Sequence, residues 1–287
     1  MSRVPRILLS LALLLPVAGQ AVAASTEEER ARNAVRVLSE IQQIPEQAIP
    51  DKLLDEARGI VVIPDTIKAG LVLGGRRGHG LMSVKGADGT WTNPVFVTLT
   101  GGSIGFQAGV QSSDVVLVFR NDRSLDDIVN GKFTLGADAG VAAGPVGRNA
   151  AALTDGQLKA EIWSWSRARG LFAGVALDGA VLQIDDDANV AVYGPNSTPR
   201  AILENRAGQA PSNAIVDFRD RLEEASATAR VARGGSAVPV ARTPAGAPPI
   251  RDVPEATTIP AQHNDPRPQA FETVDDQPAT VEPLPEY

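Results

Sequence analysis

The sequence predicts an α+β fold: a curved antiparallel β core, similar to a β-barrel or sandwich, with flanking helices. Short apolar runs rich in β-branched residues recur from residue 59 to residue 193, separated by turn residues such as Gly, Asp and Ser. Short strands at this spacing are typical of an antiparallel sheet that closes or folds over on itself. Stretches with helical spacing lie before and after these runs, so helices are expected at both ends of the core.

Residues 26–44 are expected to form the first helix. Three glutamates occupy its first turn, and Val37, Leu38 and Ile41 fall on one apolar stripe. Further helical segments are expected over residues 51–57, 124–130 and 212–232.

The expected strands follow from apolar runs bounded by turn signals. We expect Asp185-Asp186-Asp187 to be a solvated hairpin turn and His79, between two glycines, to lie in another turn. The strands are expected at residues 59–64, 69–74, 80–85, 94–99, 103–110, 114–120, 133–142, 172–177, 180–185 and 189–193.

Glycines recur every four residues in the β region. They match neither the dinucleotide-binding spacing G-x-G-x-x-G nor the phosphate-binding loop G-x-x-x-x-G-K-[ST]. Residues four apart share one face of a strand, and interior glycine suits a strand that another backbone or a ligand approaches closely. We therefore expect close packing in a curved sheet, or a bare face that admits an extended apolar ligand. These glycines are Gly70, Gly74, Gly78, Gly101, Gly105, Gly109, Gly136, Gly140, Gly144, Gly170 and Gly174.

Residues 1–23 have the features of a secretory signal peptide. Arg3 and Arg6 precede an apolar run over 7–19, and Ala21-Val22-Ala23 provides a small-x-small cleavage site. The run is shorter than the roughly 20 residues of a membrane-spanning helix, so cleavage is expected rather than anchoring. We expect a bacterial periplasmic or secreted protein. The chain has no cysteine, which excludes disulfides and thiolate metal sites.

The composition changes over residues 234–287. This segment contains 11 of the 21 prolines and, from residue 235 onward, three basic against eight acidic residues. Such a composition buries too little apolar surface to offset ordering entropy, which predicts a disordered acidic Pro-rich tail. Proline-rich segments are pre-extended and suit docking to a protein partner.

Four motifs in the middle of the chain carry a family resemblance. They are Asp-Thr-Ile-Lys-Ala-Gly at 65–70, Gly-Gly-Arg-Arg-Gly at 74–78, Thr-Leu-Thr-Gly-Gly-Ser-Ile-Gly at 98–105 with Gln-Ala-Gly at 107–109, and Ser-Arg-Ala-Arg-Gly-Leu-Phe-Ala-Gly at 166–174. In this order they resemble the SYLF domain family, over about residues 30 to 195. We therefore expect a SYLF-like domain over residues 24–233.

The SYLF family occurs alone in many exported bacterial proteins and beside SH3 or FYVE domains in eukaryotes, including actin-patch proteins. The resemblance implies phospholipid binding, and in some members actin binding. This chain departs from the eukaryotic pattern because it contains neither an SH3 nor a FYVE domain. It also has Ala168 where the family commonly has a serine, and a periplasm holds no actin, so affinity for membrane lipid is the property expected to carry over.

Catalysis is not expected. His79 is the only histidine outside the predicted tail, which excludes a histidine-rich metal site. The absence of cysteine excludes a cysteine nucleophile. We expect no catalytic residues, no bound metal, no cofactor and no nucleic-acid partner.

Two groups of residues are candidates for lipid binding. Trp163, Trp165, Arg167 and Arg169 share one face if residues 162–169 are extended. Tryptophan favours the membrane interface, and arginine can donate two hydrogen bonds to a phosphate. The alternative is a cation–π cluster that covers the edge of the core.

The second group comprises Lys68, Arg76, Arg77 and Lys85 on neighbouring strands or their turn. Basic residues near an anionic surface strengthen binding, and the alternative is that these are solvated turn charges. We predict a non-enzymatic, exported, phospholipid- or membrane-surface-binding domain. The alternative function is a structural or protein-interaction module of the envelope that recruits partners through its tail.

Overall fold

The computed structural model describes residues 26–45, 47–70, 73–104, 109–146, 159–168 and 170–235. All of them fall within one compact unit, Met1–Pro239. The predicted signal peptide (1–23), nearly all of the predicted tail (234–287), the residues between Ile104 and Gly109, and Arg169 lie outside the described residues.

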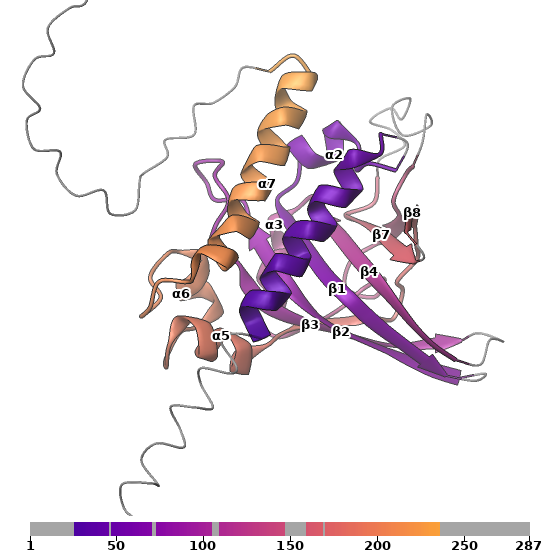
Figure 1. Ribbon diagram of the computed structural model, residues 1–287, viewed down its shortest axis with the longest axis horizontal. Coiled ribbons are helices and arrows are strands. Elements are labelled where there is room, and N and C mark those ends of the chain that lie inside the picture. The colour runs from indigo at the N-terminus through magenta and orange to yellow at the C-terminus, as the bar shows by residue number, and fades with distance from the viewer. Residues whose placement is uncertain are drawn as a thin grey trace, which may run out of the picture. The chain divides into compact units, whose positions relative to one another are not determined.

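One strongly curled sheet forms the core of the described part of the chain (Figure 1). Its strands are β1 (Gly59–Gly70), β2 (Leu73–Val84), β3 (Val95–Ile104), β4 (Gly109–Phe119), β5 (Lys132–Thr134), β6 (Val141–Ala143), β7 (Ile162–Ala168), β8 (Leu171–Gly174) and β9 (Val181–Ile184). The strand order is β5-β9-β3-β2-β1-β4-β7-β6, and β8 pairs with β7. Every pair is antiparallel except β6 with β7, which is parallel. The predicted α+β class with a curved β core is confirmed.

Helices cover one face of this sheet. The N-terminal helix (residues 26–43, indigo) and α7 (Asn213–Ala232, orange) both cross in front of the strands in Figure 1. The remaining helices are α2 (Asp51–Asp55), α3 (Asp122–Asn130), α5 (Asp186–Tyr193) and α6 (Pro199–Leu203). No helix in the described ranges combines the length and the apolar content that a bilayer-spanning segment needs.

The sheet is buried at one end and exposed at the other. Residues 59–64 of β1 and 114–119 of β4 are buried or nearly so, whereas 65–70 and 109–113 are largely exposed. In Figure 1 the far ends of β1, β2 and β4 project beyond the helices at the lower right. We call this part the open end: residues 65–70, 73–79, 99–104 and 109–113.

The open end explains two wrong strand predictions. Residues 69–74 and 103–110 were each expected to be one strand, but the chain passes from β1 to β2 and from β3 to β4 within these ranges. The strands are longer than predicted because they continue past the core, where burial no longer imposes an apolar pattern.

A third prediction was wrong for a local reason. Residues 189–193 belong to helix α5 and not to a strand, and Asp185 is not in a hairpin turn. The Asp185 side chain accepts a hydrogen bond from the Ala188 N–H and so caps the helix. Asp186 and Asp187 follow in its first turn, where negative charge is favourable.

Glycines in the sheet allow other groups to approach closely, as predicted. A Cβ atom on Gly80 would lie 2.2 Å from the Val62 carbonyl oxygen, and one on Gly174 would lie 2.2 Å from the Gly144 carbonyl oxygen. A Cβ on Gly78 would lie 2.5 Å from the Thr66 hydroxyl. The packing interpretation is thus confirmed at Gly78 and Gly174, and Gly80, which lies outside the predicted series, is crowded in the same way.

Candidate functional site

A groove of about 590 Å³ opens between the N-terminal helix and the open end of the sheet. Its wall is the first part of the helix, and its floor comes from β1 and β2. In register, Ile67 pairs with Arg77 and Ala69 pairs with Gly75, so these four residues form adjacent rows on the helix-covered face. The lining residues are Thr26, Glu29, Arg30, Asn33, Pro64, Asp65, Ile67, Ala69, Gly75, Arg76, Arg77, Gly78 and His79.

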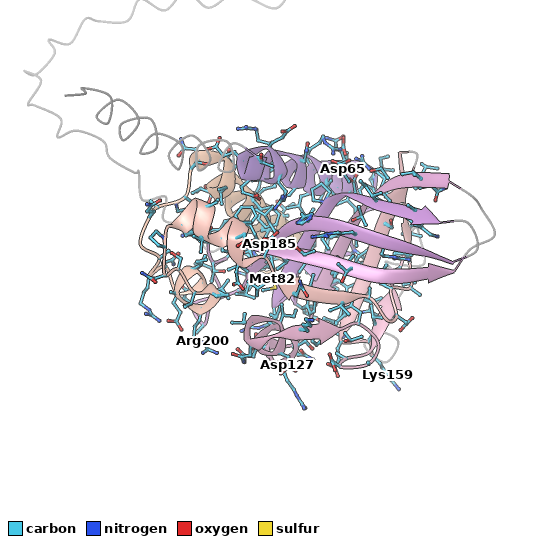
Figure 2. The ribbon with its side chains drawn as sticks, turned by 90° about the horizontal axis from the view of Figure 1, so that it is seen from below. Asp65, Met82, Asp127, Lys159, Asp185 and Arg200 are labelled. Carbon is cyan, nitrogen blue, oxygen red and sulfur yellow. The ribbon has the colours of Figure 1, made fainter. Side chains whose placement is uncertain are left out.

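A polar cluster lies beside the groove where the helix, β2 and the start of α5 meet. The His79 Nδ1 is 3.0 Å from an Asp185 carboxylate oxygen, and the Thr98 hydroxyl donates to the same oxygen at 3.3 Å. Arg30 lies 2.5 Å from Glu27 and 3.8 Å from Asp185. Figure 2 shows Asp185 in the middle of the molecule beside the strands. The cluster therefore ties the N-terminal helix, β2, β3 and the start of α5 together at the edge of the groove.

The cluster does not have the geometry of a catalytic triad. A triad needs the acid on one ring nitrogen of histidine and the nucleophile on the other. Here Thr98 and Asp185 both approach Nδ1 of His79. His79 lies within strand β2, so its prediction in a turn was wrong. Among the described residues nothing bonds its Nε2, and the ring lines the groove.

Two carboxylates of the cluster have pKa values shifted in opposite directions. Burial raises the pKa of Glu27 above its usual value, an effect that Arg30 opposes only in part. Burial acts in the same direction on Asp185, but hydrogen bonds from His79 and from the Ala188 N–H outweigh it and lower the pKa of Asp185. Asp185 is therefore the carboxylate that the cluster holds ionised.

The lowered pKa of Asp185 predicts a pH-dependent contribution to stability. Because its folded pKa lies below the unfolded value, the contribution is complete above about pH 4 and is lost as the pH falls through the folded pKa. Urea unfolding of the wild type and of Asp185→Asn, measured at several pH values, tests this. The gap between the two proteins should shrink below about pH 4. A gap that stays constant down to strongly acid pH would contradict the prediction.

A buried ion pair holds the bulge in β1 that forms part of the groove. Asp65 has a left-handed backbone conformation with φ of 49°, and its N–H donates to the Asp114 carboxylate at 3.0 Å. Arg167 donates to the other oxygen of Asp114 at 2.6 and 2.9 Å. Arg167 also pairs with Glu40 of the N-terminal helix. This group, which we call the clasp, connects β1, β4, β7 and the helix.

In the first group of predicted lipid-binding residues, the two tryptophans pack into the core and Arg167 belongs to the clasp. Residues 162–168 are extended, as β7 requires. However, Trp163 is 7% exposed and Trp165 is fully buried, with its indole N–H donating to the Pro145 carbonyl. The Arg167 guanidinium is held in the clasp and lies 5.2 Å from the centre of the Phe172 ring. Arg169 lies outside the described residues. In this conformation the two indoles are not available to a bilayer, and a lipid-binding role for this group stays a prediction.

The structure brings together three of the four residues in the second group. Lys68 pairs in register with Arg76, and Arg77 follows on the helix-covered face. Lys85 lies apart: it is buried, donates to the Asp55 carbonyl and lies 5.2 Å from the centre of the Trp91 ring. Within the part of the chain that the structure describes, no carboxylate forms an ion pair with Lys68, Arg76 or Arg77. This follows from the salt bridges of the described residues, in which none of the three takes part.

Two exposed aliphatic residues at the open end were missed by sequence reasoning. Ile67 is 53% exposed and Val110 is 74% exposed. Val110 ends the predicted strand 103–110, and Ile67 falls between the predicted strands 59–64 and 69–74. The available signal was their position near charged or polar neighbours, Lys68 and Gln111, at the end of long strands.

Comparisons with known proteins agree on one family. Residues 100–225 match the family model described as "Ysc84: Las17-binding protein actin regulator". Protein YSC84 of Saccharomyces cerevisiae is 32% identical over 193 residues, covering 65% of this chain and 41% of the relative. The same yeast's LAS seventeen-binding protein 3 is 32% identical over 193 residues, covering 66% of this chain and 41% of the relative.

A human relative extends the comparison. SH3 domain-containing YSC84-like protein 1 of Homo sapiens is 31% identical over 175 residues, covering 59% of this chain and 51% of the relative. The chain thus spans between about two fifths and one half of the length of these relatives. The family description names a binding protein and regulator, one relative is named as a binding protein, and none of these names describes an enzyme.

Proposed function

The chain belongs to the SYLF (Ysc84) family, and from this premise we propose that it is a non-enzymatic domain that binds anionic phospholipid surfaces through the open end of its sheet. The membrane concerned is that of a bacterial envelope, in keeping with the predicted signal peptide. The open end reaches past the helices, so it can meet a flat surface without unfolding (Figure 1).

The observation that carries this proposal is the exposure of aliphatic residues beside cations that have no ion-pair partner among the described residues. Ile67 and Val110 together present aliphatic side chains that water contacts in the free protein. Arg77 lies opposite Ile67 on the same face, and Lys68 follows Ile67 on the other face. Apolar groups that enter the acyl boundary, flanked by cations at the level of the headgroups, are the usual means of interfacial binding.

The environment of Arg76 is a separate reason to propose an anionic ligand. Its guanidinium is half-buried, and burial lowers the pKa of this group. A cation that is withdrawn from water without a carboxylate partner is costly. A phosphate placed beside it would offset part of this cost through charge-assisted hydrogen bonds.

Removing two cations of the open end should weaken vesicle binding. Each exposed Lys or Arg near an anionic surface contributes about 1 kcal/mol. The variant Lys68→Ala/Arg77→Ala should therefore bind roughly 30-fold more weakly, since 1.4 kcal/mol corresponds to about tenfold. The measurement is co-sedimentation of the full chain with vesicles that contain graded amounts of phosphatidylglycerol, at low and moderate salt.

A control variant with the same change of charge is available on α6 and the loop after it. Arg200→Ala/Arg206→Ala removes two exposed arginines, and Figure 2 shows Arg200 far from the tips of the strands. This control should bind vesicles like the wild type. Equal loss in both variants would mean that net charge alone governs binding, and this result would reject the open end as the binding site.

A protein partner is the second candidate function. The relatives' printed names point to it, because the family is described as Las17-binding. In this chain the folded region carries the family match, and the predicted Pro-rich tail would offer a further docking segment. A full chain that ignores anionic vesicles at low salt would favour this second proposal over the first.

A further inference from the structure

We infer that the groove binds a single-chain anionic amphiphile of the long-chain fatty acid class. This inference goes beyond surface binding, because it assigns a defined groove to one molecule. It shares Ile67 and Arg77 with the proposed function but does not require a bilayer.

The size of the groove selects the class of ligand. Its volume of about 590 Å³ lies inside the range of roughly 300–1,000 Å³ that is usual for small-molecule sites. A water molecule takes about 30 Å³ of liquid volume, and a methylene group is of similar size, so the groove holds on the order of 20 non-hydrogen atoms. This is the size of one long acyl chain with its carboxylate, and about half the size of a two-chain phospholipid.

The floor of the groove suits an acyl chain. Pro64, Ile67 and Ala69 of β1 line it with apolar groups, and Gly75 of β2 lies directly opposite Ala69. A Cβ atom on Gly75 would meet only the Gly101 carbonyl oxygen, at 3.9 Å. Packing therefore does not require glycine at position 75, unlike at Gly80. The absent side chain instead keeps the floor low where a ligand would lie.

The β2 side of the groove suits an anionic head group. Arg77 and His79 lie two residues apart on the helix-covered face of β2 and both line the groove. Arg77 has no ion-pair partner within the described residues, and the Nε2 of His79 has no hydrogen-bond partner there. Glu29 and Asp65 also line the groove, on the helix and at the β1 bulge. The contact with a carboxylate is therefore assigned to β2 and not to these two walls.

The test introduces a larger side chain on the floor of the groove. Gly75→Val adds a branched side chain at a position where an added Cβ meets no atom closer than 3.9 Å, and β-branched residues are favoured in strands. Gly102→Val is the matched control, since Gly102 pairs with Gly75 in register, has no heavy atom within 4 Å of an added Cβ, and does not line the groove. The probe is cis-parinaric acid, a fluorescent fatty acid of the size that the groove holds, used in its monomeric range and followed by fluorescence, with sodium palmitate as the displacing ligand.

We expect the wild type and Gly102→Val to bind the probe alike, and Gly75→Val to bind it at least tenfold more weakly. Ala69→Leu, which fills the same row from β1, should show a similar loss, so the test does not depend on one variant's folding. Circular dichroism melting checks that each variant is folded. Unchanged probe binding in both filled variants, or no probe binding by the wild type, would overturn the inference.

Vesicle co-sedimentation of the same variants separates the two proposals. Gly75→Val leaves Ile67, Val110 and the cations of the open end in place, so its vesicle binding should match that of the wild type. Loss of probe binding with retained vesicle binding supports both proposals. Vesicle binding that disappears in the Lys68→Ala/Arg77→Ala variant while Gly75→Val still binds the probe would support the membrane proposal and reject the groove.

Discussion

Replacing Asp114 with alanine should lower the free energy of unfolding by about 3–5 kcal/mol, the usual result of breaking a buried ion pair from one side. The side chains of Arg167 and Asp114 are only 15% and 7% exposed. Alanine at position 114 would leave the Arg167 guanidinium in the protein with Glu40 alone, and the Asp65 N–H without its acceptor. Urea unfolding followed by circular dichroism measures the loss.

A second variant separates the charge effect from the packing effect. Replacing both partners, as Asp114→Leu/Arg167→Met, removes the buried cation together with its partner, and apolar pairs of this kind are often close to neutral. The double variant should therefore be more stable than Asp114→Ala. A loss below about 1 kcal/mol in Asp114→Ala would show that the clasp behaves as an exposed pair, for which such small values are typical.

Adding one methyl group at Gly80 should be nearly as damaging. The added Cβ would lie 2.2 Å from the Val62 carbonyl oxygen and 2.8 Å from the Ile63 Cα. Both contacts are with backbone in a buried part of β1, which cannot move aside as a flexible side chain can. We expect Gly80→Ala to lose about 3 kcal/mol or more, at the upper end of overpacking effects.

Gly75→Ala in the same strand is the matched control for Gly80→Ala. It meets no atom closer than 3.9 Å, and it reduces the conformational freedom of the unfolded chain, which contributes about 0.4–1 kcal/mol in favour of folding where the conformation permits. The two variants should thus differ by several kcal/mol in urea unfolding. Similar stability of both would mean that β1 and β2 do not approach each other at Gly80 as described.

The two predicted groups of lipid-binding residues had different outcomes for one physical reason. Spacing in a strand predicts which side chains share a face, and β7 is extended as that argument requires. It does not predict what packs on the face. Neighbouring elements cover Trp165 and hold Arg167, whereas the face around Arg77 borders an open groove.

The predicted boundaries of strands and helices were wrong where tertiary contacts, and not the local sequence pattern, decide where an element begins and ends. The apolar alternation that predicts a strand exists because one face is buried, so it fades along β1 and β2 once they leave the core. Helix α5 was read as a strand because Val190 and Val192 are β-branched, while the cap at Asp185 outweighed their preference.

The sequence by itself determined the α+β class, the flanking helices and the close approach of strands at glycines, because these depend on residue size and on local periodicity. Only the tertiary structure decided which basic residues are free. Arg167 and Lys85 find partners far away in the chain, at Asp114 and at Asp55, and Arg77 finds no ion-pair partner among the described residues. Such pairings depend on which strands and helices meet, and no spacing along a single segment encodes them.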